Sequence, residues 1–237
     1  MAKNKLIPSW EPHGLAIQSY FNGNMDAQIG ILMDDGETVF MPASIYFREK
    51  EEIPELEQIA LNHCKGKTLD VGAGAGAHSL LLQENGIDVT ALDIDPKGVE
   101  IMRSRGVKHT VCGDFLSYNP KENFDSLLFL MNGIGIAENL NGLKSFLNHA
   151  KEICNQKAQI ILDSSDLRIS NPDLDFKESY FGEVDYQLSF EGVVGEKYTW
   201  LYIDFDTLSD IADELAWKAE LILENEDGSY LAKLSLI

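Results

Sequence analysis

Residues 67–78 read KTLDVGAGAGAH, and the turn that they encode sets the architecture of the chain around it. An apolar run that ends at Val71 predicts a β-strand, and Gly72, Gly74 and Gly76 follow it at alternate positions. Glycine accepts backbone conformations that other residues avoid, and it lets the backbone approach a ligand with no Cβ in the way. The stretch therefore predicts a strand that turns tightly into a helix beside a bound ligand.

Strand-like and helix-like segments alternate after this turn. Further strands are predicted over residues 87–93, 107–112, 124–131 and 158–163. Helices are predicted over residues 75–85, 96–105 and 140–150. The third of these strands is almost entirely apolar, as expected for a strand that is covered on both faces. The alternation predicts a parallel sheet with helices on both faces.

Capping signals mark where two helices are expected to begin. Asp95 precedes Pro96, so Asp95 is predicted to cap a helix that Gly106 ends. The stretch Thr207–Asp210 has the form of a capping box and predicts another helix. A periodic apolar face predicts one more helix over residues 52–64, before the glycine-rich turn.

The two ends of the chain differ from this alternating pattern. A short helix is predicted over residues 13–21, and apolar runs at 27–33 and 38–47 flank an Asp-Gly hairpin signal. Two strand-like runs lie within residues 183–203, and a second Asp-Gly signal predicts a C-terminal hairpin. We therefore predict an N-terminal cap of helix and hairpin over 1–50, and a main domain over 51–237 with an insertion at about 168–205.

The composition narrows the classes of partner. The 237 residues include 19 Lys and Arg against 39 Asp and Glu, so the net charge is −20 and a nucleic-acid partner is not expected. No run of apolar residues is long enough to predict a membrane span. The three cysteines are far apart, which favours neither a disulfide framework nor a zinc site, and we expect a cytoplasmic protein. The sequence gives no oligomeric state.

The glycine-rich stretch resembles the first motif of the class I, Rossmann-like S-adenosylmethionine-dependent methyltransferases, which is an acidic residue followed by x-Gly-x-Gly-x-Gly. The resemblance implies a seven-stranded, mostly parallel sheet with an antiparallel C-terminal strand, and S-adenosyl-L-methionine as cofactor. It also implies that the acid and the glycine loop hold the amino-acid end of the cofactor. Asp70 accepts hydrogen bonds only, which suits an ammonium group. The loop residues so assigned are Asp70, Gly72, Ala73, Gly74 and Gly76, with His78 lining the same end.

Two further strand ends carry carboxylates that suit a nucleoside. Asp93 ends its predicted strand and is expected to accept hydrogen bonds from both ribose hydroxyls, in a dinucleotide site as well as in this family. In the family that the chain resembles, an aspartate at the position of Asp114 accepts from the adenine amino group, and the next backbone N–H meets a ring nitrogen. Ile94 and Phe115 are then expected to wall the adenine, unless they belong to the core.

The remaining candidates lie at other strand ends and in the N-terminal segment. Asn132 follows a strand at the edge where ligands bind in open α/β sheets, and a plain turn is an equal alternative. The stretch 163–166 reads DSSD, but no further ligand at a suitable spacing supports a metal site. Tyr20 and Tyr46 are assigned to a lid over the substrate or to packing. Arg48 is assigned to a carboxylate of cofactor or substrate, or to the surface.

The reaction expected from these features is in-line transfer of a methyl group to a small-molecule acceptor. The chain lacks the Asn/Asp-Pro-Pro-Tyr of the nucleic-acid amino methyltransferases after its fourth strand, which argues against methylation of a nucleobase or of a glutamine amide. Most of the chain looks similar to bacterial methyltransferases of unassigned substrate, and no catalytic base is identified. The alternatives are an NAD(P)-dependent oxidoreductase, since Gly72, Gly74 and Ala77 also fit a dinucleotide motif, and a non-catalytic nucleoside-binding protein.

Overall fold

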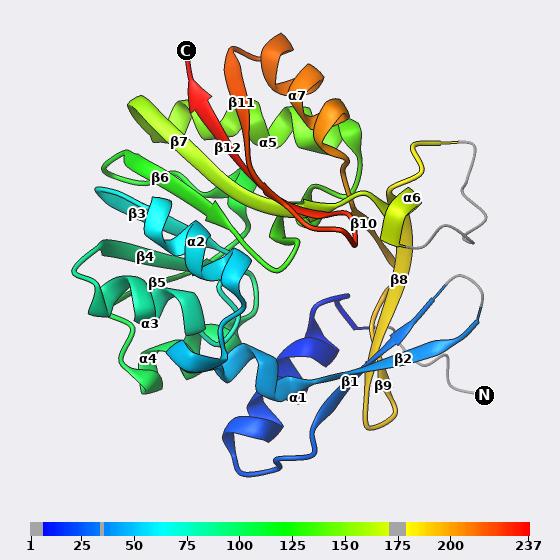
Figure 1. The fold of residues 1–237 in the computed structure, drawn as a ribbon. Coiled ribbons are helices and arrows are strands. Elements are labelled where there is room, and N and C mark those ends of the chain that lie inside the picture. Colours follow the sequence, from blue (N-terminus) through cyan, green and yellow to red (C-terminus); the bar gives the residue numbers. More distant parts are fainter. Residues whose placement is uncertain (1–6, 34–35, 171–178) are drawn as a thin grey trace.

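A seven-stranded sheet forms the centre of the computed structural model, which describes residues 7–33, 36–170 and 179–237 (Figure 1). The strands lie in the order β11-β12-β7-β6-β3-β4-β5. Neighbouring strands from β7 to β5 are parallel, whereas β12 is antiparallel to both β7 and β11. The predicted mostly parallel sheet with an antiparallel C-terminal strand is confirmed. The strands are β3 (Lys67–Val71), β4 (Asp88–Asp93), β5 (His109–Cys112), β6 (Phe124–Phe129), β7 (Cys154–Ser165), β11 (Trp217–Glu224) and β12 (Ser229–Leu236).

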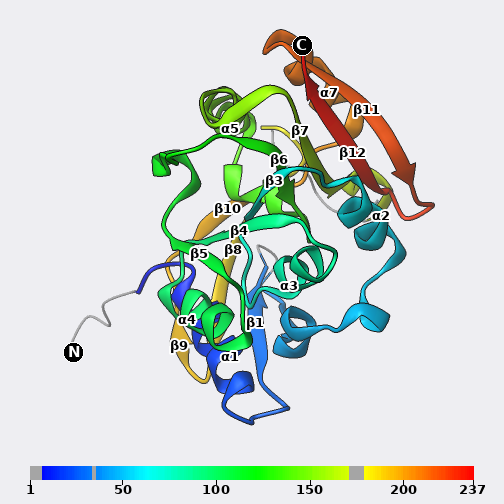
Figure 2. The same ribbon diagram turned by 90° about the vertical axis from the view of Figure 1, so that its left-hand side faces the viewer.

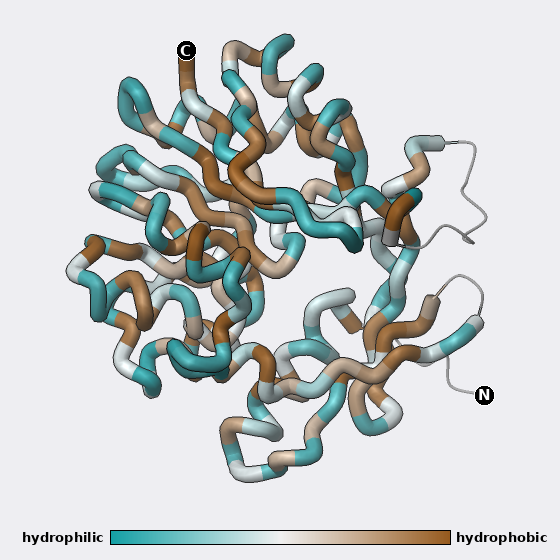
Figure 3. Tube along the Cα trace, viewed as in Figure 1, coloured by the Kyte–Doolittle hydropathy of each residue, from teal (hydrophilic) through white to brown (hydrophobic). Residues whose placement is uncertain are grey.

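Helices cover both faces of this sheet because successive side chains of a strand point to opposite sides. Leu128 and Ile161 pack with helices α2 and α3 on one face, and α4 lies on the same side. Leu127 and Ile160 pack with α5 and α7 on the other face. Hydropathy along the chain shows the apolar residues gathered in the strands between these two helical layers (Figure 3). The helices are α2 (Glu55–His63), α3 (Ala77–Glu84), α4 (Pro96–Arg105), α5 (Leu140–Ile153) and α7 (Phe205–Glu214).

The cap predicted for α4 is confirmed, and the one predicted for α7 is wrong. The Asp95 side chain accepts a hydrogen bond from the Lys97 N–H, and Gly106 ends α4 with a positive φ. In α7 the capping residue is Asp204, whose carboxylate accepts from both the N–H and the hydroxyl of Thr207. Because the Asp204 carboxylate accepts a backbone N–H at the start of the helix, α7 begins before Thr207. Thr207 therefore lies inside the helix and does not cap it.

A second, smaller sheet joins two segments that are far apart in the sequence. The N-terminal hairpin pairs with the segment that follows α6: β1 and β8 are antiparallel, with Ile31 opposite Leu188. The strand order is β10-β8-β1-β2, with β9 beside β8. This sheet consists of β1 (Gln28–Leu32), β2 (Thr38–Pro42), β8 (Glu183–Phe190), β9 (Val193–Val194) and β10 (Tyr198–Leu201). The residues at the centre of the predicted turn, 34 and 35, lie outside the described part of the chain.

One face of the small sheet packs on α1 (Glu11–Phe21), through Ala16, Ile29, Leu188 and Phe190. The stretch after β2 was expected to remain extended, but it forms the short 3-10 helix η1 (Ala43–Phe47). Pro42 has no N–H to continue the strand pairing, which is consistent with this change of conformation. We call α1, η1 and the small sheet together the cover. Figure 2 shows α1 beside α4, below the main sheet.

The remaining short helices lie in the connections between these elements. They are η2 (Lys50–Glu52), η3 (Phe115–Ser117), η4 (Gly133–Ala137) and α6 (Leu167–Ser170). The helices η3 and η4 follow the carboxyl ends of β5 and β6. In the described residues, no helix is long and apolar enough to cross a lipid bilayer.

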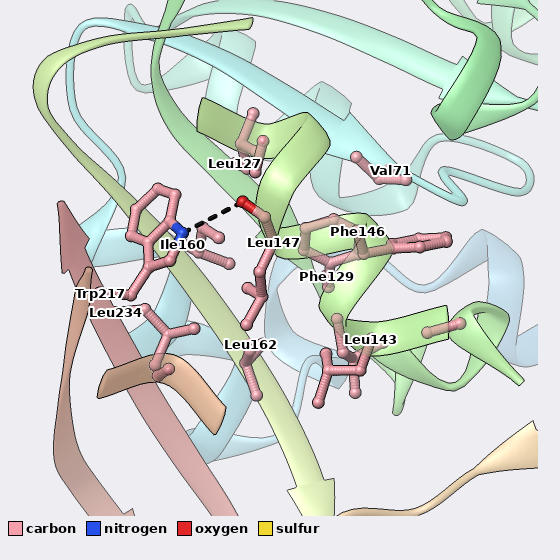
Figure 4. Close-up of a cluster of buried hydrophobic side chains, with 14 of the residues drawn as sticks. Val71, Leu127, Phe129, Leu143, Phe146, Leu147, Ile160, Leu162, Trp217 and Leu234 are labelled. Carbon is pink, nitrogen blue, oxygen red and sulfur yellow. Dashed lines mark hydrogen bonds between the residues drawn. The ribbon is translucent and has the colours of Figure 1, made fainter. Parts of the chain in front are cut away.

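Trp217 is the largest fully buried side chain, and it joins β11 to α5 (Figure 4). Its indole Nε1 donates a hydrogen bond to the Leu147 carbonyl at 3.1 Å. We expect Trp217→Ala to lower the free energy of unfolding by about 3–5 kcal/mol, because it removes the ring and leaves a cavity. Trp217→Phe should lower it by about 1–3 kcal/mol through the unpaired carbonyl and the smaller ring. Urea unfolding measures both.

Leu221 is the control for this prediction, since it lies on the same strand and is 39% exposed. Leu221→Ala should change the free energy of unfolding by less than about 1 kcal/mol. If Trp217→Ala and Leu221→Ala lower the free energy of unfolding equally little, the contact of Trp217 with α5 does not stabilise the core.

Candidate functional site

The glycine loop after β3 adopts a backbone that requires glycine. The φ angles of Gly72, Gly74 and Gly76 are +72°, +56° and +83°, all in the left-handed region. A Cβ at Gly76 would lie 2.9 Å from the Met102 side chain, so this glycine also allows α4 to approach. A Cβ on Gly72 would meet no atom within 4 Å. The loop therefore faces open space at Gly72 and is closely packed at Gly76.

Asp93 at the end of β4 holds this loop in place. One carboxylate oxygen accepts from the Gly74 N–H at 2.7 Å, and the other accepts from the Asp95 N–H at 2.8 Å. Burial raises the pKa of Asp93 to about 6, although the two backbone donors act to lower it. One buried carboxylate thus connects the glycine loop to the start of α4.

Asp70 anchors the other side of the loop. Its carboxylate is buried and accepts a hydrogen bond from the Ser79 hydroxyl at 2.6 Å. Burial raises the pKa of Asp70, while the charge of His78 and the Ser79 hydrogen bonds oppose the increase. The acid of the sequence motif therefore fixes the start of α3 relative to β3.

His78 belongs to a buried cluster of polar side chains that was not predicted from the sequence. Its Nε2 lies 2.6 Å from a carboxylate oxygen of Glu57 in α2. Arg48 contacts both oxygens of the same carboxylate, at 2.7 and 2.9 Å. The Arg48 guanidinium is therefore bound by the chain's own carboxylate. The available signal was the position of Glu57, because it lies three and four residues before Ala60 and Leu61, on the buried face of α2.

This cluster keeps Glu57 ionised although it is buried. Burial acts to raise the pKa of Glu57, but hydrogen bonds and charges from His78 and Arg48 hold it below its ordinary value. Arg48 directly follows η1 of the cover, and His78 lies in the first turn of α3, two residues after Gly76 of the loop. Glu57 therefore connects the cover to the loop electrostatically.

The ends of β4 and β5 present two exposed apolar side chains. Ile94 is 46% exposed and Leu116 is 42% exposed. The predicted neighbour Phe115 is instead only 3% exposed, and it packs with Phe146 in the core. Asp114 is exposed and accepts a hydrogen bond from the Ser117 hydroxyl at 3.0 Å. The exposure of Leu116 was not predicted from the sequence. The only feature that could have indicated it is that this apolar residue stands in a short polar loop.

Asn132 braces three elements at the end of β6. Its N–H donates to Asp163 on β7 at 2.9 Å, and its side-chain amide donates to the Leu201 carbonyl at the end of β10 at 3.2 Å. Its side-chain oxygen accepts from the Ser164 hydroxyl at 2.8 Å. Asn132 has a φ of +55°, so this residue forms a tight turn as well. The amide is used to hold β6, β7 and the small sheet together.

The cover lies directly on the glycine loop. A Cβ at Gly74 would be 3.2 Å from the Tyr46 ring, so the ring is seated on the loop backbone. The edge of His13 contacts the same ring at 4.5 Å between centroids. Burial lowers the pKa of His13 to about 4, so His13 is neutral around pH 7. Tyr20 packs against Phe47, within the cover.

Arg105 and Gly14 secure this arrangement from α4 and α1. The Arg105 guanidinium donates to the Ala75 carbonyl of the loop at 2.7 Å and to the Tyr46 carbonyl of η1 at 3.3 Å. Gly14 is required where α1 meets α4, because a Cβ there would lie 1.8 Å from a carboxylate oxygen of Asp95. The structure therefore brings the glycine loop, the end of β4 and Tyr46 together. Within the described ranges, no group of His, Cys, Asp and Glu is arranged to hold a metal ion.

We expect Glu57→Gln to lower the free energy of unfolding by about 3 kcal/mol, because it leaves the buried Arg48 guanidinium without its anion and weakens the hydrogen bond with His78. The folded-state pKa of Glu57 is lowered, so its contribution is fully present above the ordinary pKa of a glutamate and is lost as the pH falls through the folded value. The difference between wild type and variant should be full at neutral pH and shrink in acid. Urea unfolding at several pH values measures it.

Glu55→Gln is the matched control, because Glu55 is exposed on the same helix. It should change stability by less than about 0.5 kcal/mol. Equal effects of the two variants at neutral pH would show that Glu57 gains nothing from its burial between Arg48 and His78.

Comparisons with known proteins agree with this geometry. Residues 69–162 match the family profile described as a methyltransferase domain. A solved structure of an S-adenosylmethionine-dependent methyltransferase from Bacteroides fragilis, in complex with S-adenosyl-L-homocysteine, is 36% identical and covers 98% of each chain, with a TM-score of 0.88. No curated protein matches the chain.

Two more distant structures share the fold. CalS10, an amino pentose methyltransferase from Micromonospora echinaspora, is 12% identical over 77% of this chain and 90% of its own, with a TM-score of 0.54. The glycopeptide N-methyltransferase MtfA is 11% identical over 77% of this chain and 86% of its own, with a TM-score of 0.58.

The likeness to the Bacteroides fragilis enzyme extends over nearly the whole chain, including the cover and the insertion. It decides against the oxidoreductase and the non-catalytic binding protein that the glycine motif left open. The chain uses S-adenosylmethionine as its cofactor, and it belongs to the S-adenosylmethionine-dependent methyltransferases.

Proposed function

We propose that this methyltransferase acts on a small molecule, which binds between the carboxyl edge of the main sheet and the cover. The observation that carries the proposal is the direct seating of the cover on that edge. The Tyr46 ring lies on Gly74, and the Trp200 ring lies on Gly135 of η4, where a Cβ would be 2.1 Å from the indole nitrogen. A cover seated on the edge in this way favours a small acceptor over a chain that must pass beneath it.

The residues along the edge fit S-adenosylmethionine. Gly72 faces open space, as a loop that approaches a ligand must. The Asp93 carboxylate accepts hydrogen bonds from two backbone N–H groups. A carboxylate can accept about four hydrogen bonds, so Asp93 can still accept from the ribose hydroxyls. Ile94 and Leu116 offer exposed apolar surface for the adenine, and Asp114 offers an acceptor for its amino group.

The amino-acid end of the cofactor is assigned to the glycine loop. Asp70 lies beneath the loop and supplies negative charge there, which favours an ammonium group nearby. His78 and Arg48 are already paired with Glu57, so in this proposal they hold the loop and the cover in place. When bound, S-adenosylmethionine supplies a methyl group activated by the sulfonium.

The chain's own contribution is alignment and exclusion of water. The leaving group is a neutral thioether, so positioning the acceptor behind the methyl carbon can provide much of the rate. The aromatic side chains of the cover replace water around the reacting atoms. The strong negative charge of the chain opposes a nucleic-acid acceptor.

Asp93→Ala tests the cofactor assignment. Each lost hydrogen bond to the carboxylate costs about 1.5–3 kcal/mol, so S-adenosylhomocysteine should bind roughly tenfold to hundredfold more weakly or worse. Asp93→Asn should be milder, because the amide keeps one acceptor. Calorimetry measures the affinity, with Asp88→Ala as control, since Asp88 is exposed at the other end of β4. A folded Asp93→Ala protein that binds like wild type would show that Asp93 is not the ribose ligand.

The class of acceptor can be tested without knowing its identity. A bacterial extract is separated by ultrafiltration into small molecules and macromolecules, and each fraction is incubated with enzyme and S-adenosylmethionine. We expect S-adenosylhomocysteine to form with the small-molecule fraction and not with the macromolecules, since the cover is seated directly on the edge that binds the acceptor. The same incubation with the Asp93→Ala variant is the control, because S-adenosylhomocysteine that still forms with this variant does not come from the enzyme. Formation with the macromolecular fraction alone would contradict the proposal.

A further inference from the structure

Asp163 is a carboxylate at the reacting edge without a cation of its own. It lies near the carboxyl end of β7, is partly exposed, and accepts the Asn132 N–H at 2.9 Å. Among the described residues no Lys, Arg or His forms an ion pair with it, whereas Glu57 close by is paired with both Arg48 and His78. The carboxylate is thus suited to receive a cation from outside the chain.

A row of aromatic rings lies on the part of the small sheet that Asn132 joins to this carboxylate. Tyr186, Tyr198 and Trp200 lie on one face of the small sheet, with ring centroids 6.2 and 6.0 Å apart along the row. Asn132 connects the row to the carboxylate, because it donates to Asp163 through its N–H and to the Leu201 carbonyl through its side chain. Aromatic faces combined with a carboxylate bind organic cations.

We propose that the acceptor is an organic amine, that its ammonium binds Asp163 beside the aromatic row, and that Asp163 takes its proton before methyl transfer. This inference rests on the proposed function. The inference adds two points to the proposed function, namely the chemical class of the acceptor and a catalytic residue.

The step balances in atoms and charge. The ammonium R–NH₃⁺ gives one proton to the Asp163 carboxylate, which leaves the nitrogen lone pair free. That pair forms the new N–C bond while the C–S bond breaks, and its electrons remain on sulfur as the neutral thioether of S-adenosylhomocysteine. The product leaves as R–NH₂⁺–CH₃, and Asp163 releases its proton to water.

The surroundings of Asp163 suit a proton acceptor. Burial raises its pKa to about 7 and the charge of Glu57 adds to this, while the Asn132 N–H and His78 oppose it. A base is most effective when its pKa lies near the working pH. The titratable groups that face it are Glu57 on α2, His78 on α3 and Tyr230 on β12.

Binding of probe amines to the S-adenosylhomocysteine complex tests this inference. The probes are arylalkylamines, each matched with the alcohol and the carboxylic acid of the same carbon skeleton, and ligand-observed NMR measures binding. We expect the amines to bind and the matched alcohols and acids to bind less. Asp163→Asn should weaken the amines roughly tenfold or more, the effect of a lost charge-assisted contact.

The pH dependence provides a readout that a merely structural role would not change. An ammonium needs ionised Asp163, so amine binding to wild type should strengthen as the pH rises through about 7, and Asp163→Asn should lose this dependence. Asp166→Asn is the control, because Asp166 lies nearby and is already paired with Arg168. It should bind the amines like wild type.

The outcomes separate this inference from the proposed function. If no amine binds, if alcohols or acids bind as well, or if Asp163→Asn keeps both affinity and pH dependence, the amine proposal is overturned. Calorimetry should give wild type and Asp163→Asn the same affinity for S-adenosylhomocysteine. Failure of wild type itself to bind S-adenosylhomocysteine would instead overturn the cofactor assignment.

Discussion

The hydrogen bonds from the glycine loop and from the start of α4 to the Asp93 carboxylate determine how the site is built. The loop backbone is left-handed at three glycines, and because glycine loses more conformational freedom on folding than any other residue, contacts from outside the loop are needed to hold one conformation. Asp93 supplies it by accepting from both Gly74 and Asp95. A neutral side chain at this position would hold the two donors less strongly, since hydrogen bonds to ionised groups are the stronger ones.

The other contacts of the site follow from the position of this loop. Tyr46 is seated on Gly74, and α4 approaches so closely that a Cβ on Gly98 would lie 2.8 Å from the Gly74 carbonyl oxygen. Arg105 then joins the loop to η1 through two carbonyl groups. The cover can rest on the loop only because the glycines leave no side chains between them.

Charge and aromatic character are distributed unequally around this edge. The buried Arg48 guanidinium is balanced by Glu57, which also contacts His78 and holds the cover against the start of α3. Asp163 forms no ion pair with a described residue, and Asn132 joins it to β10, which carries part of the aromatic row. Methyl transfer from a sulfonium needs an aligned and dry acceptor, and in the proposed site the carboxylate without an ion-pair partner favours a cationic acceptor.

Local features of the sequence determined the strands, most helices and the two hairpins, because hydrophobic period, capping residues and turn residues act over a few neighbours. They also placed Asp70, Asp93 and the glycines at the edge of the sheet. Tertiary structure alone decided that β1 pairs with β8, that Glu57 joins Arg48 to His78, and that Leu116 is exposed while Phe115 is buried. These depend on contacts between residues far apart in the chain, whose free energy is set by burial and charge in the folded protein and leaves no periodic trace in the sequence.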